Sequence, residues 1–246
     1  MKVLTLALRA VPLASSREGS VFPSKSRGRV TLSFGLIGLA LALSSTQAQT
    51  WQTHRSPNFI VQTASQADTQ YLEHLFQTLQ SARKDLKNFS LEPPGRVLVV
   101  VHPSLESYRK ATAQPWFVLA QANRAEHQID VQRLHVVAER GQLEAVLRHE
   151  YFHLAQPEDW PRWLAEGSAM IFAGQKPTAK ALEGVSATRL EEILANPPNS
   201  QTLARAMAGA YERARAYWKK RGHTPYALPL TEKSFGVRHK TSQIPA

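Results

Sequence analysis

Apolar positions in the first half of the chain follow strand patterns and helix patterns in turn. The segment NFIVQTA (58–64) is rich in β-forming residues and predicts a strand. The continuous apolar run VLVVV (97–101) is typical of a buried strand. Between them, apolar residues recur at helical spacing, with Ser65 and Asp68 suited to capping the start of that helix. Farther along, SLESYRKATA (104–113) predicts a short helix, whereas HQIDV (127–131) and LHVV (134–137) predict strands.

The second half has a helical pattern throughout. From Gly141 the apolar positions indicate a helix that is buried on most sides, and Pro157 ends it. A second helix is expected from about 162 to 172, a shorter one over ATRLEEILA (187–195), and a last periodic helix carries apolar residues from Leu203 to Trp218. The pattern predicts an α+β protein in which a small mixed sheet is followed by a helical half.

Candidate chemistry lies in the buried helix, in the motif HEYFH. His149 and His153 are four residues apart, so both imidazoles lie on one helix face and can bind one cation. Glu150 lies about 100° further round the helix, where it can reach a water on the metal without being a ligand. A catalytic zinc needs three protein ligands plus water, and Glu166 on the next helix has the reach to be the third.

The alternative is that these are chance polar residues on a helix. Most accidental matches to such a motif lie on the surface, and buried histidines without a metal need other partners for their ring nitrogens. The apolar surroundings of this motif and the third carboxylate favour the metal site. One zinc ion per chain is therefore expected.

Composition narrows the class of protein further. The chain of 246 residues has no cysteine, which excludes disulfides and thiolate ligands, so a metal must be held by histidine and carboxylate. Residues 1–48 carry six Lys or Arg and one Glu, so that 24 basic and 18 acidic residues follow them, with a net charge of +6. These are scattered rather than clustered with aromatic residues, so nucleic acid is not the expected partner.

The N-terminus has the pattern of an export signal. Basic residues precede the apolar run VTLSFGLIGLALAL (30–43), and small residues suited to cleavage near Ala48 follow it. The run is short for a membrane span, so removal of residues 1–48 and a secreted or periplasmic location are expected. An uncleaved segment that anchors the protein in the membrane is the alternative.

HEYFH and the downstream WLAEG (163–167) together resemble the gluzincin metallopeptidases, and the short spacing is closest to bacterial peptidase MA-like domains. The resemblance is strong over 146–174 and extends more weakly over 51–222. It implies a zincin-like, thermolysin-type fold with the active-site helix between sheet and helical half, zinc on His149, His153 and Glu166, and Glu150 as general base.

Two further site assignments follow from the resemblance. AYERARAYWKKRG places Tyr211 where the aminopeptidases of this group have a tyrosine that stabilises the transition state, although its apolar helix face equally predicts core packing. Tyr217 is the second candidate. Zincin folds also bind extended substrate along an edge strand, and we assign this role to His127, Gln128, Ile129, Asp130 and Val131.

The expected function is that of an exported zinc peptidase acting on a peptide or protein substrate, with its catalytic domain over 49–222 and a C-terminal tail over 223–246. No G-x-M-E-N-type segment is found, so the resemblance does not imply exopeptidase specificity. The competing interpretation is a non-catalytic envelope interaction protein of the same fold, stabilised by zinc. The intact Glu150 favours the enzyme, because a purely structural site has no use for a base.

Overall fold

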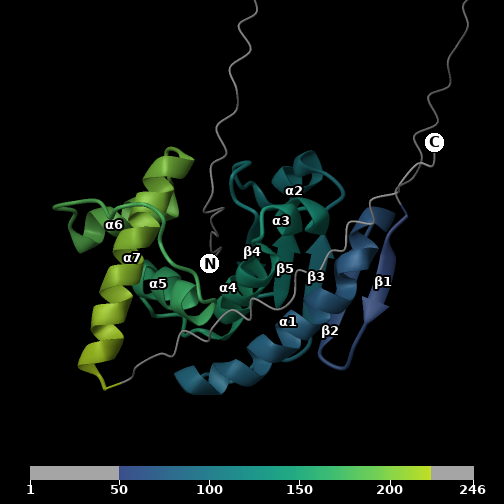
Figure 1. Cartoon of the computed structure of the whole chain (residues 1–246), viewed down its shortest axis with the longest axis horizontal. Helices are drawn as coiled ribbons and strands as arrows, with labels where there is room; N and C mark the ends of the chain where they lie inside the picture. The colour runs from purple at the N-terminus through teal and green to yellow at the C-terminus, as the bar shows by residue number, and fades with distance from the viewer. Residues whose placement is uncertain (1–49, 223–246) are drawn as a thin grey trace, which may run out of the picture. The chain divides into compact units, whose positions relative to one another are not determined.

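The computed structural model of the chain describes residues 50–222, so the expected export signal and C-terminal tail lie outside this range. The strands are β1 (Gln52–Arg55), β2 (Phe59–Thr63), β3 (Val97–Val101), β4 (Ala120–Asn123) and β5 (Gln128–Val131). The helices are α1 (Leu72–Asp85), α2 (Leu105–Thr112), α3 (Leu134–Glu139), α4 (Leu143–Ala155), α5 (Arg162–Phe172), α6 (Ala187–Ala195) and α7 (Ser200–Lys220). The described part is thus α+β, as predicted (Figure 1).

The five strands form one mixed sheet in the order β1-β2-β3-β5-β4. Strands β2, β3 and β5 are parallel neighbours, and β1 and β4 pair antiparallel at the two edges. In β2 and β3 every second residue is buried, as the period of two in a strand requires when one face packs on a core.

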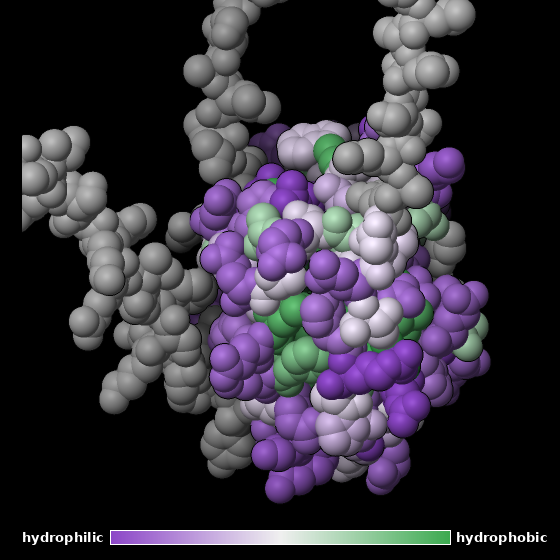
Figure 2. Space-filling view, turned by 90° about the vertical axis from the view of Figure 1, so that its right-hand side faces the viewer, coloured by the Kyte–Doolittle hydropathy of each residue, from purple (hydrophilic) through white to green (hydrophobic). Residues whose placement is uncertain are grey.

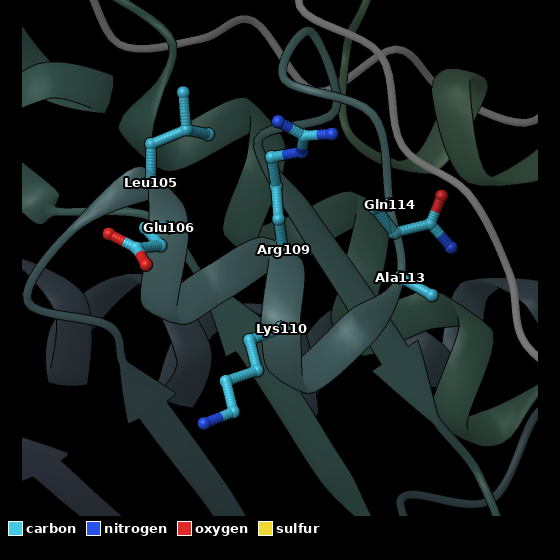
Figure 3. Close-up of a pocket in the computed structure, with 6 residues that line it drawn as sticks. All are labelled: Leu105, Glu106, Arg109, Lys110, Ala113 and Gln114. Carbon is cyan, nitrogen blue, oxygen red and sulfur yellow. The ribbon is translucent and has the colours of Figure 1, made fainter.

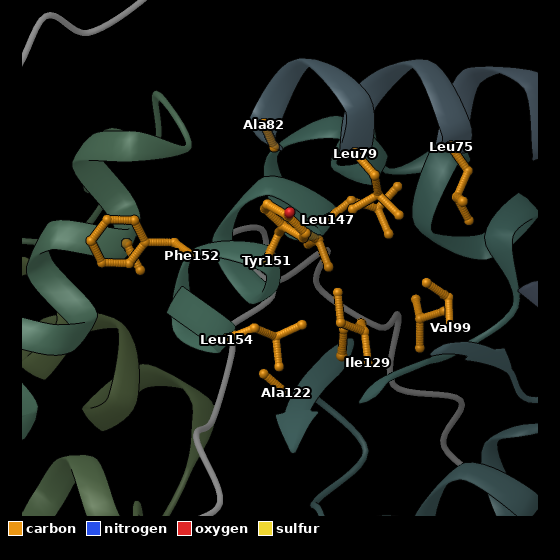
Figure 4. Packing of buried hydrophobic residues seen from close by; sticks show 14 of the residues in the cluster. Leu75, Leu79, Ala82, Val99, Ala122, Ile129, Leu147, Tyr151, Phe152 and Leu154 are labelled. Carbon is orange, nitrogen blue, oxygen red and sulfur yellow. The ribbon is translucent and has the colours of Figure 1, made fainter. Parts of the chain in front are cut away.

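Helices α4 and α1 both face the buried side of the sheet: α4 contacts β4 and β5, and Leu75 of α1 points towards Val99 of β3 (Figure 4). Leu147 and Tyr151 of α4 are fully buried between Leu79 of α1 and Ile129 of β5 in the same cluster. A helix enclosed in this way has few positions open to water, which explains why its apolar residues occur on nearly every side.

Helices α5, α6 and α7 form the helical half, with a second cluster of buried residues that includes Met170, Leu190 and Met207. Helix α5 crosses α7 at very short range at Gly167. A Cβ added there would lie 2.3 Å from the backbone oxygen of Ala210 and 2.6 Å from the Cβ of Ala214. Only glycine allows this approach, and Gly167 directly follows one of the candidate ligands.

The surface is mainly hydrophilic on the face drawn in Figure 2, where apolar residues form only small patches. Among residues 50–222 no helix is both long enough and apolar enough to span a membrane.

Two local predictions are wrong, and one strand was not predicted. LHVV is part of helix α3, whereas AQAN, which carried no strand signal, forms strand β4. Ser65 and Asp68 do not form a side-chain cap. Instead the Ser65 hydroxyl accepts a hydrogen bond from Arg133, and the buried Asp68 carboxylate accepts one from the backbone N–H of His135. Tertiary contacts therefore decide the roles of both residues.

Candidate metal centre

Two adjacent helices bring His149, His153 and Glu166 together. The histidines lie one turn apart on the same face of α4, with ring centroids 4.7 Å apart, and Glu166 comes from α5. The Glu166 Oε2 atom is 3.3 Å from Nε2 of His149 and 3.5 Å from Nε2 of His153. One possible ligand atom from each residue lies within 4.8 Å of the other two, and all three side chains are buried. This group can hold a metal ion.

Two glutamines contact the opposite side of the imidazole rings. The amide oxygen of Gln175 lies 2.7 Å from Nδ1 of His149, and that of Gln156 lies 2.8 Å from Nδ1 of His153. An amide oxygen only accepts hydrogen bonds, so with the two amides in this orientation each Nδ1 carries the proton and donates it. Each Nε2 is then left with a lone pair that faces Glu166.

With the protons on Nδ1, the cluster presents acceptors without donors. His153 Nε2, Glu166 Oε1 and both carboxylate oxygens of Glu150 have no hydrogen-bond partner among the described residues. Buried polar atoms are nearly always paired, and unpaired ones call for a physical explanation such as an ion. A cation between the two Nε2 atoms and Glu166 would satisfy them, and two imidazoles with one carboxylate are a known ligand set of catalytic zinc.

The electrostatics of the ligands suit a cation as well. Burial alone would raise the pKa of Glu166, but the charge of His153 and hydrogen bonds from the rings of His149 and His153 outweigh it and lower this pKa to about 2. Burial also lowers the pKa of His149. At neutral pH the cluster is therefore a carboxylate with a neutral imidazole, which is the protonation state that binds metal.

Glu150 is fully buried beside the cluster. Burial and, secondarily, the charge of Glu166 raise its pKa well above the ordinary range, while the backbone of Ala122 in β4 acts in the opposite direction. Tyr108 of α2 is buried too, and its pKa is raised by burial, by Glu150 and by Asp130. A bound cation would favour the ionised form of Glu150.

The tyrosines are placed differently from the metal group. Tyr211 is partly buried and packs against both clusters of buried residues, with the Arg215 guanidinium 5.7 Å from its ring centroid. Within residues 50–222 no hydrogen bond connects its hydroxyl to the candidate ligands. Tyr217 contacts the rings of Trp163 and Trp218. Their catalytic roles stay predictions.

The strand assigned to substrate is not an edge strand. Residues 128–131 form β5, which pairs with β3 on one side and β4 on the other, and His127 lies in the preceding turn with a φ of 48°. The edge strand beside α4 is β4. The assignment of His127, Gln128, Ile129, Asp130 and Val131 is thus wrong, because a strand already paired on both sides has no backbone groups free for a peptide.

A surface hollow of about 670 Å³ runs along α2 from Leu105 to Gln114 (Figure 3), and a second one of about 420 Å³ lies past the end of the helix and shares Arg109, Ala113 and Gln114 with it. The amide of Gln114 donates to Gln121 of β4 at 2.6 Å, which links this region to the edge strand. In Figure 3 the Arg109 and Lys110 side chains point away from each other, and Glu106 lies on the same helix.

Gln156 and Gln175 were not identified from the sequence. The sequence offers only a signal for the helix ends: Pro157 directly follows Gln156, and Gly174 directly precedes Gln175. Each glutamine therefore lies next to a residue that predicts the end of a helix. Nothing in the sequence indicates which histidine each one contacts.

Comparisons of the chain with models of protein families, with curated proteins and with solved structures give no match. The interpretation of the metal centre therefore depends on its own geometry.

Proposed function

We propose that this chain is an exported zinc-dependent peptidase of the gluzincin type, with a zincin-like fold. The observation that carries the proposal is the convergence of three buried side chains, His149, His153 and Glu166, whose possible ligand atoms all lie within 4.8 Å of one another. Zinc in this position would lower the pKa of a bound water and polarise the scissile carbonyl.

Glu150 is the base in this proposal. It lies on the same helix as both histidines but is not part of the ligand group, and no side chain of the described residues donates to its carboxylate. Its raised pKa suits a group that takes a proton from water and returns it to the leaving amine near neutral pH.

The edge strand β4 supplies a binding surface for an extended peptide. Gln132 N–H donates to Leu119 O, so in this antiparallel register Gln121 and Asn123 also point their backbone groups at β5. The backbone N–H and C=O groups of Ala120 and Ala122 then point to the open edge. A peptide pairing there by β-augmentation would lie beside α4 and Glu150.

The experiment combines metal analysis with cleavage of a quenched fluorescent peptide library by the full chain. We expect about one zinc per chain, as for a single three-ligand site. His153→Ala should lose the metal, because two ligands remain. Glu150→Gln should keep the metal and the fold but lose cleavage by about 10²- to 10⁴-fold, since the base is removed.

Each outcome distinguishes the alternatives. Full zinc occupancy in His153→Ala would refute the ligand assignment, and unchanged cleavage by Glu150→Gln would exclude it as base. Zinc binding without cleavage of any peptide by the native chain would favour the zinc-stabilised interaction protein.

A further inference from the structure

Gln156 and Gln175 lie at or just past the C-terminal ends of the two helices of the metal centre. Each follows the last turn of its helix, and each contacts the Nδ1 atom of one histidine. Their side chains are almost completely buried, with 1% and 9% of the residue surface exposed. This repeated arrangement calls for a common explanation.

Local structure fixes Gln156. Because Pro157 disfavours helical conformation in the residue before it, α4 ends there and Gln156 is extended, with φ −64° and ψ 151°. Its backbone N–H still donates to Phe152 O. The side chain is thereby directed back over the last turn to His153, three residues earlier.

A different cap fixes Gln175. Gly174 has a φ of 67°, its N–H donates to Ile171 O, and the N–H of Gln175 donates to Met170 O. This pair of bonds is the Schellman motif, in which a left-handed glycine closes the helix. The motif holds Gln175 in place, so its side chain can cross from the end of α5 to His149 on α4.

Two opposite proton arrangements are compatible with these positions. If the amide oxygens face the rings, both Nδ1 atoms carry protons and both Nε2 lone pairs face Glu166, which leaves a preformed cation site. If both amides were turned round, their nitrogens would donate to Nδ1, and the Nε2 protons would bond to Glu166. The cluster would then be a closed hydrogen-bond network with no need of a metal.

We infer that Gln156 and Gln175 are positioning residues that hold both histidines in the Nδ1–H tautomer and so determine the affinity of the site for zinc. The inference extends the proposed function: it assumes that zinc binds to His149, His153 and Glu166, but it does not require that the chain cleaves peptides. Because both amides are neutral, the negative charge of the cluster comes from Glu166 and Glu150 alone. Partners of this kind typically change metal affinity by about 10- to 100-fold.

Metal affinity tests the positioning role without any activity. The full chain and its variants are titrated with zinc against a chromophoric chelator. Gln156→Met and Gln175→Met keep the length of the side chain but remove the acceptor, and each should weaken zinc binding by about 10- to 100-fold. Gln175→Glu keeps an acceptor and adds negative charge, so zinc should bind at least as tightly as to the native chain. Gln142→Met, the same change at the other end of α4, is the matched control and should leave the affinity unchanged.

Tautomers are read directly from long-range ¹H–¹⁵N correlation spectra of the metal-free full chain, with signals assigned through His149→Gln and His153→Gln. We expect the Nδ1–H form for both rings and loss of this preference at His149 in Gln175→Met. Nε2–H tautomers in the native chain would overturn the inference, as would methionine variants that bind zinc as tightly as Gln142→Met. A chain with Nδ1–H tautomers that binds no zinc would refute the proposed function and not the tautomer assignment.

Discussion

At the scale of single residues, several buried polar atoms of the metal centre have no hydrogen-bond partner among the described residues. His149, His153 and Glu166 direct three acceptors into one buried space, and acceptors facing each other at 3.3 and 3.5 Å repel unless a proton or a cation lies between them. The neutral Nε2–H tautomer would place a proton there, but the glutamine amide oxygens at 2.7 and 2.8 Å from the two Nδ1 atoms favour the Nδ1–H tautomer instead. A divalent cation resolves the repulsion without protonating either ring.

Tyr211 tests whether a side chain next to the centre takes part in the reaction. If its hydroxyl donates to the oxyanion, Tyr211→Phe should lower kcat by about 100-fold or more, with little change in peptide affinity, because the bond forms mainly in the transition state. Stability should change little, since the ring stays between the two buried clusters. Steady-state kinetics and thermal melts of the metal-loaded chain measure both effects.

Tyr217→Phe is the control for this prediction. Its ring packs on Trp163 and Trp218, so we expect unchanged turnover. Loss of turnover in Tyr217→Phe alone would show that the second tyrosine donates to the oxyanion. Full turnover in both variants would assign oxyanion stabilisation to the metal and to other donors.

At the scale of elements, the position of Glu166 depends on the contact between α5 and α7. Gly167→Ala would place a methyl group 2.3 Å from a backbone oxygen of α7, so the two helices must separate. We expect a loss of about 1–3 kcal/mol in the free energy of unfolding, as for other overpacked sites, together with weaker zinc binding because Glu166 moves with its helix. Denaturant unfolding and chelator competition measure the two effects.

Gly209→Ala is the matched substitution on α7. The nearest atoms to its added Cβ lie 3.9 Å away, so the methyl group fits, and alanine should stabilise the helix by about 0.5–1 kcal/mol over glycine. Equal destabilisation by both substitutions would show that the close approach at Gly167 does not support the centre.

The sequence predicted elements well where one periodicity was strong. Helix α5 was predicted over 162–172 and α6 over 187–195, and the structure has the same bounds, because apolar periodicity and flanking prolines agree there. The spacing of His149 and His153 likewise predicted their shared face, since the geometry of a helix fixes it. Glu166 was expected from its reach, and the structure places it beside both rings.

The errors arose where pairing partners decide the structure. LHVV has β-branched residues but lies in α3, and the alanine-rich AQAN becomes a strand by pairing with β5. The β5 segment was taken for the edge because strand order in a sheet cannot be read from a strand's own residues. The two glutamines were missed for the same reason, since Gln175 reaches a histidine 26 residues away.

At the scale of the whole molecule, the metal centre lies where α4 packs on both the sheet and α5, so its charges affect the stability of the whole fold. The free energy of unfolding should therefore depend on pH through the carboxyl groups of the centre. Folding shifts the pKa values of two of these groups, Glu166 and Glu150, in opposite directions. The folded pKa of Glu166 is about 2, against an ordinary 4.5, so it stabilises the fold above pH 4.5, and this stabilisation is lost as the pH falls towards 2. The folded pKa of Glu150 is raised, so its favourable contribution exists below pH 4.5 and is lost as the pH rises through the folded value.

Substituting each carboxylate should therefore have opposite effects on the metal-free full chain. Glu150→Gln should be more stable than the native chain at pH 7, and the difference should shrink towards pH 4, by at most about 1.4 kcal/mol per pH unit for one proton. Glu166→Gln removes this carboxylate, so its stability relative to the native chain should fall as the pH rises from 3 to 4.5 and change little above 4.5. Denaturant unfolding with a chelator present, at pH 7, 5.5, 4 and 3, measures both differences.

Zinc without the chelator should then stabilise the native chain and Glu150→Gln far more than Glu166→Gln, because these two chains keep all three ligands. Metal that binds only the folded state adds its binding free energy to stability. Parallel pH profiles for the two variants, or equal stabilisation of all three chains by zinc, would contradict the opposed roles of the two carboxylates.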